Sequence, residues 1–373
     1  MGRRVMDDAM KVAAVGATVG WLAFAGAAAG QAQTLAQTYE AAKAEGEVSI
    51  IGPPMVALRE ELTKGFSAAY PGITVSFHGM MGGAPATKMK AERAAGIFAT
   101  DAVISGTDTG INQMKPERLI RPFADMIVDP DAMDPKKWLD GGLYWSDKDQ
   151  TVLVLLSMIS PVMVINTDMV KPGELTSDKD LLDPRWKGKI AANDPLVPGN
   201  AGLIFRRFYE LHGLDYLKKL NAQDVVVSKD LRQVVDWVAK GRYAIGIGVS
   251  PATINQYQAQ GVKTVGTIAN WEWKDPMYMT AGFGDLFVPE KAAHPNAAKL
   301  FVNWLLTRDG QLALSRGIGY PSRRLDVPVD HIPEYLRVRP GIDYVLTESE
   351  EYRTSKVRAE VQKAITEIGF GRR

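Results

Sequence analysis

Residues 151–165, TVLVLLSMISPVMVI, form an uncharged run rich in β-branched side chains near the middle of the chain. With 15 residues, the run is shorter than the ~20 residues that a membrane-spanning helix needs. Pro161 removes a backbone donor from any helix or central strand built through it. The pattern therefore predicts two short buried strands that meet at Pro161 and form a hinge between two domains. An ordinary core strand within one large domain is the alternative.

Before this run the pattern alternates between strands and helices. It predicts strands at residues 47–52, 73–78 and 101–105, and helices at residues 56–70 and 86–95. The first helix carries Leu58, Leu62 and Phe66 at intervals of four, which gives it one apolar stripe. The strand-helix-strand order implies parallel strands with crossover helices, and open sheets of this kind bind ligands at the carboxyl ends of their strands.

The same alternation returns after the run. Strands are expected at residues 189–192, 224–228, 243–249 and 262–268, and helices at 201–211, 215–220, 231–240 and 297–306. Residues 278–289 form a second apolar extended stretch, as expected of a chain that crosses from one domain to the other and back. Val357, Val361, Ile365 and Ile368 predict a last amphipathic helix that packs on one of the domains.

Composition limits the partners and the chemistry. The chain has 373 residues, of which 46% are hydrophobic and 23% charged, and this length favours two globular domains. Without residues 1–32 it holds 41 basic and 41 acidic residues, so neither nucleic acid nor an anionic membrane is expected as a partner. Cysteine is absent, which excludes disulfides, thiolate metal sites, cysteine nucleophiles and a lipoprotein anchor.

Residues 1–32 have the pattern of a cleaved signal peptide. Arg3, Arg4 and Lys11 supply positive charge, and an apolar segment rich in alanine and glycine follows at residues 12–29. Ala32 ends a Gly-Gln-Ala sequence that offers small residues to a signal peptidase. We therefore expect a soluble protein in the periplasm, with a retained membrane anchor as the alternative. The arginine pair leaves both the general secretory and the twin-arginine export routes open.

Several stretches resemble extracellular solute-binding proteins of ABC importers. They are residues 88–106 (KMKAERAAGIFATDAVISG), 181–195 (LLDPRWKGKIAANDP), 238–248 (VAKGRYAIGIG), 294–311 (HPNAAKLFVNWLLTRDGQ) and 319–324 (GYPSRR). The resemblance covers most of the chain after the signal peptide. It implies an α/β, two-lobed periplasmic-binding-protein fold of type II, in which each lobe is a mixed, mostly parallel sheet flanked by helices and hinge strands join the lobes.

On this resemblance the N-terminal lobe comprises residues 33–155 and 276–325, and the C-terminal lobe residues 156–275. Residues 326–373 form a helical tail that packs on the lobes. The implied role is to capture a small anionic organic solute between the lobes and deliver it to a membrane permease with its ATPase. The protein is expected to be a monomer without a cofactor, and to bind no nucleic acid.

The resemblance includes a branch that contains ferric-iron-binding proteins and binders of phosphonates or phosphorylated sugars. Iron-binding members carry consecutive tyrosines where this chain has Ser250-Pro251-Ala252-Thr253, and an early histidine where it has Gly52-Pro53-Pro54. Ferric iron prefers anionic oxygen ligands, which these residues do not supply. We therefore predict no metal site, and ferric-iron transport is kept as the alternative function.

Two glycine-bearing loops precede helices and are candidate anion sites. Gly82 and Gly83 open one helix, and Gly199, Asn200 and Ala201 open another in the second lobe. Backbone N–H groups and the helix dipole at such a terminus hold an anion without a basic side chain. Two such termini facing one cleft would clamp an anionic group, whereas the simpler alternative is a glycine turn with a cap.

Other candidates follow the predicted strands. Ser105 and Thr107 offer hydroxyl donors, or alternatively cap a helix. Ser250 and Thr253 occupy the position of the family's tyrosines. Trp271 and Trp273 share a face of an extended chain and are candidate walls for a ligand, with surface packing as the alternative. His78 is the histidine expected nearest the cleft.

The sequence does not favour an enzyme, and we predict no catalytic residues. The four histidines are scattered without an H-E-x-x-H motif, and neither a G-x-S-x-G elbow nor a Walker loop occurs. Gly246-Ile247-Gly248 lacks the third glycine of a dinucleotide-binding loop. An exported enzyme and a ligand-loaded sensor subunit are the alternatives from other functional classes.

Overall fold

Parallel strands from the first third of the chain form one side of a large sheet. In the computed structural model, which describes residues 34–160, 163–197, 200–268, 273–339 and 344–371, this first sheet has seven strands in the order β2-β1-β3-β14-β6-β5, with β4 paired to β14. The strands are β1 (Glu47–Gly52), β2 (Thr74–Gly79), β3 (Ala102–Ser105), β4 (Ile120–Arg121), β5 (Tyr144–Trp145), β6 (Leu153–Val154) and β14 (Asp285–Pro289). Both β2 and β3 pair with β1 in parallel, which confirms the order expected from the sequence.

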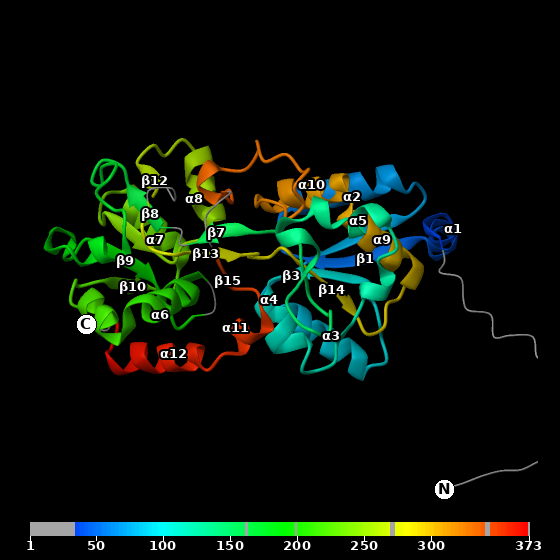
Figure 1. Ribbon diagram of the computed structural model, residues 1–373, viewed down its shortest axis with the longest axis horizontal. Helices are drawn as coiled ribbons and strands as arrows, with labels where there is room; N and C mark the ends of the chain where they lie inside the picture. The colour runs from blue at the N-terminus through cyan, green and yellow to red at the C-terminus, as the bar shows by residue number, and fades with distance from the viewer. Residues whose placement is uncertain (1–33, 161–162, 198–199, 269–272, 340–343, 372–373) are drawn as a thin grey trace, which may run out of the picture. The chain divides into compact units, whose positions relative to one another are not determined.

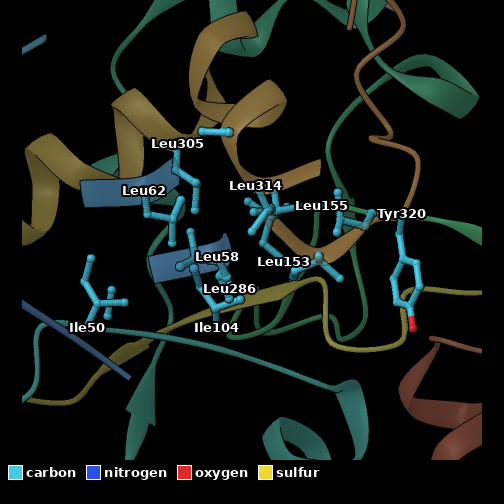
Figure 2. Packing of buried hydrophobic residues seen from close by; sticks show 14 of the residues in the cluster. Ile50, Leu58, Leu62, Ile104, Leu153, Leu155, Leu286, Leu305, Leu314 and Tyr320 are labelled. Atoms are coloured by element: carbon cyan, nitrogen blue, oxygen red, sulfur yellow. The ribbon is translucent and has the colours of Figure 1, made fainter. Parts of the chain in front are cut away.

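Helices cover the first sheet and complete the first lobe (Figure 1). They are α1 (Leu35–Glu45), α2 (Val56–Ala69), α3 (Ala84–Ala94), α9 (Pro295–Leu306) and α10 (Arg308–Ile318). The predicted stripe of Leu58, Leu62 and Phe66 is fully buried, because α2 packs between the sheet and α10. Figure 2 shows Leu58 and Leu62 beside Leu305 and Leu314 of the two later helices. Helices α1 and α10 have no counterpart in the elements predicted from the sequence.

The second lobe is built on a five-stranded sheet among the described residues. Its order is β10-β9-β11-β8-β12, and β8 runs antiparallel to its two neighbours. The strands are β8 (Met163–Asn166), β9 (Ile190–Asn193), β10 (Val226–Ser228), β11 (Ile245–Ile247) and β12 (Val265–Thr267), and the helices are α6 (Asn200–Asn221), α7 (Leu231–Ala239), α8 (Pro251–Ala259) and α12 (Val357–Glu367). As predicted, the C-terminal helix packs on a lobe: α12 lies along α6 and buries Val361 and Ile365 (Figure 1).

A third, smaller sheet lies between the two larger ones (Figure 1). Its strands are β7 (Met158–Ser160), β13 (Met277–Thr280) and β15 (Tyr344–Leu346). The two apolar stretches that the sequence identifies meet here, since β13 pairs antiparallel with β7. On its other edge β13 pairs in parallel with β15, a strand from the tail that the sequence analysis missed. We call these three strands the crossing sheet.

Short helices connect these elements. They are α4 (Thr107–Thr109), α5 (Pro130–Met133), α11 (Glu350–Thr354), η1 (Gly110–Met114), η2 (Ala124–Met126), η3 (Pro135–Lys137), η4 (Leu139–Gly141), η5 (Asp178–Leu182), η6 (Pro184–Trp186) and η8 (Glu334–Leu336). None of the helices in the described ranges is long and apolar enough to cross a bilayer.

Three local predictions need correction. The run at residues 151–165 contains three strands, not two, because Leu155, Leu156 and Ser157 separate β6 from β7. Pro161 itself lies outside the described residues. The helices expected at 201–211 and 215–220 join into α6, which Gly213 interrupts with a φ of 74°. The strand expected at 243–249 is confined to β11, and residues 251–259, for which the pattern predicts no element, form α8.

The α2 stripe provides a direct test of this packing. We expect Leu62→Ala to lower the free energy of unfolding by about 2–5 kcal/mol, because it leaves a cavity among fully buried neighbours. Val56→Ala on the same helix is the matched control. The Val56 side chain is 62% exposed, so its loss should change stability by less than about 0.5 kcal/mol. Equal effects of the two substitutions in urea unfolding would contradict this assignment of the core.

Candidate functional site

In the first lobe, the loops after β1, β2 and β3 leave the same edge of the sheet, because these strands are parallel. The loops after β1 and β2 touch: a Cβ atom added at Gly79 would lie 3.0 Å from the Cβ of Pro54. The loop after β2 also reaches the segment after β3, where the Thr109 hydroxyl donates to the Gly82 carbonyl at 3.2 Å. The three loops therefore form one continuous edge.

The first predicted anion site lies on this edge. Gly82 has a φ of +62°, which glycine adopts readily, and Gly83 is the N-cap of α3. No side chain caps this helix, and Pro85 stands in its first turn. Nothing lies within 4 Å of a Cβ added at Gly82. The start of α3 is thus open to an approaching group, as the anion hypothesis requires.

Ser105 and Thr107 are buried behind this edge. Ser105 ends β3 opposite Asp285 of β14. The Thr107 hydroxyl lies 2.5 Å from the Asp285 carboxylate and also contacts the carboxylate of Glu348. Thr107 therefore has internal partners that the sequence did not suggest, because Asp285 and Glu348 are distant along the chain.

In the second lobe, the loops after β9 and β11 meet. Nδ2 of Asn200 donates to the Val249 carbonyl at 3.1 Å. Gly248, with a φ of +80°, lies so close to Ala201 that an added Cβ would be 2.6 Å from the Ala201 Cβ. The structure thus brings Asn200 and Ala201 beside Ser250, three candidates from two separate stretches. Two further candidates, Gly199 and Trp271, lie outside the described residues.

Helix α8 begins at this meeting point. Ser250 is its N-cap residue, Pro251 occupies its first turn, and Thr253 is buried in it. The Ser250 side chain does not cap the helix and lies near the hydroxyl of Tyr320, whose pKa it lowers. Tyr320 follows α10, so this contact joins the two lobes. Tyr320 stands in the family-like stretch at residues 319–324, but no local pattern marks it as a site residue.

Close backbone packing links Tyr320 to the first-lobe candidates. A Cβ added at Gly282 would lie 2.6 Å from the Tyr320 ring, and one added at Gly106 would lie 2.7 Å from the Gly282 carbonyl oxygen. Figure 2 shows the Tyr320 ring beside the leucine cluster, with its hydroxyl directed away from the leucines. Burial raises the pKa of Tyr320 to about 12, against a smaller lowering by the nearby Ser250 side chain. The tyrosine is thus a neutral hydrogen-bonding group at neutral pH.

Two acidic residues, Asp108 and Asp194, lie next to the candidates, but the residues directly at the candidate positions are uncharged. This holds for every described residue at positions 53–55, 80–83, 105–107, 195–200, 248–250 and 281–284. An ionic ligand at these loops would therefore be recognised by backbone dipoles and hydroxyls and not by a counter-ion on a side chain.

The two remaining aromatic candidates have neighbours of their own. His78 lies on β2, where Nε2 is 3.4 Å from the Ser76 hydroxyl. Trp273 is half-buried and packs against the core of the second lobe. Surface packing, the alternative considered for this tryptophan, therefore describes its contacts in this structure.

One group of described side chains has the composition of a metal site. Potential ligand atoms of Asp178, His212 and Asp275 lie within 4.8 Å of one another. Nη1 of Arg207 donates to Asp178 at 2.7 Å, and the Ser177 hydroxyl donates to Asp275 at 2.8 Å. A guanidinium in direct contact repels a cation, so hydrogen bonds and an ion pair account for this cluster without a metal.

Solved structures share this fold. A substrate-binding protein of an ABC transporter from Agrobacterium tumefaciens has a TM-score of 0.65 and 18% identity, over 86% of this chain and 94% of that one. The periplasmic binding protein AfuA of Actinobacillus pleuropneumoniae, solved with fructose-6-phosphate bound, has a TM-score of 0.63 and 20% identity over 87% and 99%. The apo ferric ion-binding protein A of Pasteurella haemolytica has a TM-score of 0.64 and 15% identity over 87% and 98%. These similarities confirm the predicted two-lobed periplasmic-binding-protein fold.

Sequence comparison adds the family. An uncharacterized protein of Haemophilus influenzae is 32% identical over 145 residues, so the matching region spans 37% of this chain and 40% of that relative. Residues 49–312 match the family model described as "Bacterial extracellular solute-binding protein", which covers both lobes. The chain therefore belongs to the family of bacterial extracellular solute-binding proteins.

Proposed function

We propose that this protein is the substrate-binding component of an ABC importer and works in the periplasm. It captures a small anionic organic solute between the lobes and presents it to a membrane permease with its ATPase. Family membership supports the binding role, and the similar protein of an ABC transporter supports the transport role. The observation that carries the proposal is the uncapped, open start of α3 in the first lobe, together with the close contact of Gly248 with Ala201 that brings the starts of α6 and α8 together in the second.

The ligand is an anion held chiefly by backbone groups. Gly82 and Gly83 supply the start of α3 from the first lobe. Asn200 and Ala201 supply the start of α6 from the second lobe, beside Ser250 at the start of α8, and Gly199, outside the described residues, is kept in the proposed set. Such termini favour negative charge. The described residues directly at these positions carry no charged side chain, and the acidic residue of the loop before α6 is Asp194. Ser105, Thr107, Thr253 and Trp271 complete the proposed set.

Binding of the solute involves both lobes and the hinge between them. We assign residues 33–155 with 276–325 to the N-terminal lobe, 156–275 to the C-terminal lobe and 326–373 to the tail, with the hinge in the crossing sheet. A solute that contacts both lobes stabilises their closed arrangement, and that arrangement is what a permease would recognise.

A thermal-shift screen tests the ligand class. The panel contains phosphorylated sugars, phosphonates and carboxylates, with polyamines as the cationic control. We expect an anion to raise the melting temperature, because a ligand present at about 100 times its Kd adds about 2.7 kcal/mol to stability. Stabilisation by polyamines alone would contradict the anion site.

The anion found in this screen then allows a test of the site. Gly83→Val should weaken its binding by roughly tenfold, or about 1.4 kcal/mol, because the branched side chain blocks approach to the start of α3. Gly142→Val is the matched control: Gly142 is extended, and nothing lies within 4 Å of an added Cβ. Equal affinities of the two variants in calorimetry would move the site elsewhere and leave the transport role intact.

Ferric iron provides a second test. We expect no coloured iron–tyrosinate complex after ferric loading, because serine and proline start α8 and the neighbouring Tyr320 has a pKa raised to about 12 by burial. Visible absorption spectroscopy at one iron equivalent measures this. A stoichiometric charge-transfer band that disappears in Tyr320→Phe would contradict the prediction and favour ferric transport.

Export gives a third test. We expect the mature protein to begin near Gln33 and to appear in the periplasmic fraction, since residues 1–32 have the pattern of a signal peptide. Intact-mass measurement of the fractionated protein checks this. A full-length chain in the membrane fraction would instead indicate a retained anchor.

A further inference from the structure

The C-terminal segment contacts the two lobes in turn. After β15 joins the crossing sheet, α11 lies against η1 of the first lobe and α12 against α6 of the second (Figure 1). We call residues 347–358, which run from the end of β15 into the first turn of α12 and include α11, the clasp. Its contacts decide how firmly the tail holds the lobes together.

Polar contacts attach the clasp to the first lobe. The amide of Glu350 donates to the Ser146 carbonyl at 2.7 Å, and Nζ of Lys115 lies 2.8 Å from the Glu350 carboxylate. Arg358 forms an ion pair with Asp108 at 2.5 Å. These contacts fix both ends of the clasp on the same lobe.

The middle of the clasp is attached to the second lobe. The guanidinium of Arg206 lies 3.4 Å from the centre of the Tyr352 ring, and its Nη1 donates to the Tyr352 carbonyl at 2.6 Å. Glu210, which pairs with Arg206, accepts hydrogen bonds from Tyr352 and from Tyr278 of the crossing sheet. One segment thus bridges both lobes and the strands between them.

Beneath the clasp, one hydroxyl contacts two buried carboxyl groups. The Thr107 oxygen lies 2.5 Å from Oδ2 of Asp285 and also contacts Oε2 of Glu348. Asp285 is 0% and Glu348 is 4% exposed. A hydroxyl has a single hydrogen, so Thr107 donates to only one of the two. The other carboxyl group forms a hydrogen bond to Thr107 only if it carries a proton itself.

Their surroundings indicate which group is protonated. Oε1 of Glu348 accepts from the Thr280 hydroxyl at 2.5 Å and from the Ala281 amide at 2.8 Å, and Oε2 accepts from Nη2 of Arg353 at 2.7 Å. These donors suit an ionised carboxylate. Oδ1 of Asp285, in contrast, has no partner among the described residues. The proton therefore belongs on Asp285, which donates to Thr107, and Thr107 donates to Glu348.

The pKa directions of the two groups agree with this arrangement. Burial, and then the charge of Glu348, raise the pKa of Asp285 well above its ordinary 3.8. Burial alone would raise the pKa of Glu348, but Arg353 and the donated hydrogen bonds leave it lowered. The charged and titratable groups around Asp285 are Glu348 and Arg353 of the clasp, Arg323 after α10 and Tyr144 of β5. The two arginines lower its pKa by less than burial and Glu348 raise it.

We propose that the clasp docks on the first lobe together with one proton, which Asp285 carries and Thr107 connects to Glu348. When the clasp leaves, Glu348 leaves with it and water reaches Asp285, so the pKa of Asp285 falls towards its ordinary value. Between that value and the raised one, the ratio of docked to free clasp falls by up to about tenfold for each pH unit gained. Because the clasp bridges both lobes, its release at higher pH frees them to separate.

Hydrogen–deuterium exchange of the mature protein tests the proposal. The amides of Thr347 and Glu350 donate to Met279 and Ser146, so their protection reports docking. After correction for intrinsic exchange rates, protection of the wild type should fall as pH rises from about 5 to about 9, by at least tenfold in total. Asp285→Asn, which resembles the protonated acid, should keep the low-pH protection throughout. Asp309→Asn, at an 84% exposed side chain, is the control and should follow the wild type.

Two further measurements complete the test. Glu348→Gln should lose at least tenfold in protection at every pH, because Arg353 then lacks its carboxylate. In the wild type, the 13Cγ resonances of labelled aspartate should include a group that is still protonated at pH about 7. The proposal is wrong if Asp285→Asn titrates like the wild type, if wild-type protection does not depend on pH, or if every aspartate is ionised at neutral pH.

Discussion

The arrangement of the two lobes depends on the backbone hydrogen bonds of the crossing sheet. A chain that passes between two packed sheets carries buried N–H and C=O groups, and each one left unpaired is costly. Here β13 has a neighbour on both edges, with β7 antiparallel on one side and β15 parallel on the other. The tail therefore completes the connection between the lobes, although it enters the fold last along the chain.

The crossing sheet also positions the candidate site. Immediately after β13 the chain makes a tight turn at Gly282, which packs against Tyr320 and lies close to Gly106. A larger residue at Gly282 would collide with the tyrosine ring, so the position of Tyr320 beside this turn depends on this glycine. The proximity of Ser250 to the Tyr320 hydroxyl then brings the start of α8 near the same turn. The turn at Gly282 thus lies close to candidate residues of both lobes.

Charged side chains are distributed unevenly around the turn at Gly282. The described residues directly at the candidate positions carry no charged side chain, whereas the buried Glu348 and its partner Arg353 lie behind them, next to the buried carboxyl group of Asp285. Buried ionised groups are tolerated only when they are paired and hydrogen-bonded, and removing one partner is strongly destabilising. The charges behind the site therefore hold the tail in place, and the loops in front leave backbone donors for a ligand.

The sequence by itself determined the elements whose cause is local. Alternating apolar and helical patterns predicted the parallel β1, β2 and β3 and the buried stripe of α2, because periodicity depends only on which face meets the core. Glycines in the sequence also marked the starts of α3 and α6, because a glycine before a helix is a local signal as well. The tertiary structure alone decided that β15 joins β13, that Tyr320 reaches Ser250, and that Thr107 meets Asp285 and Glu348. Each of these contacts joins residues more than sixty positions apart, and no local pattern specifies which distant side chain will satisfy a buried polar group.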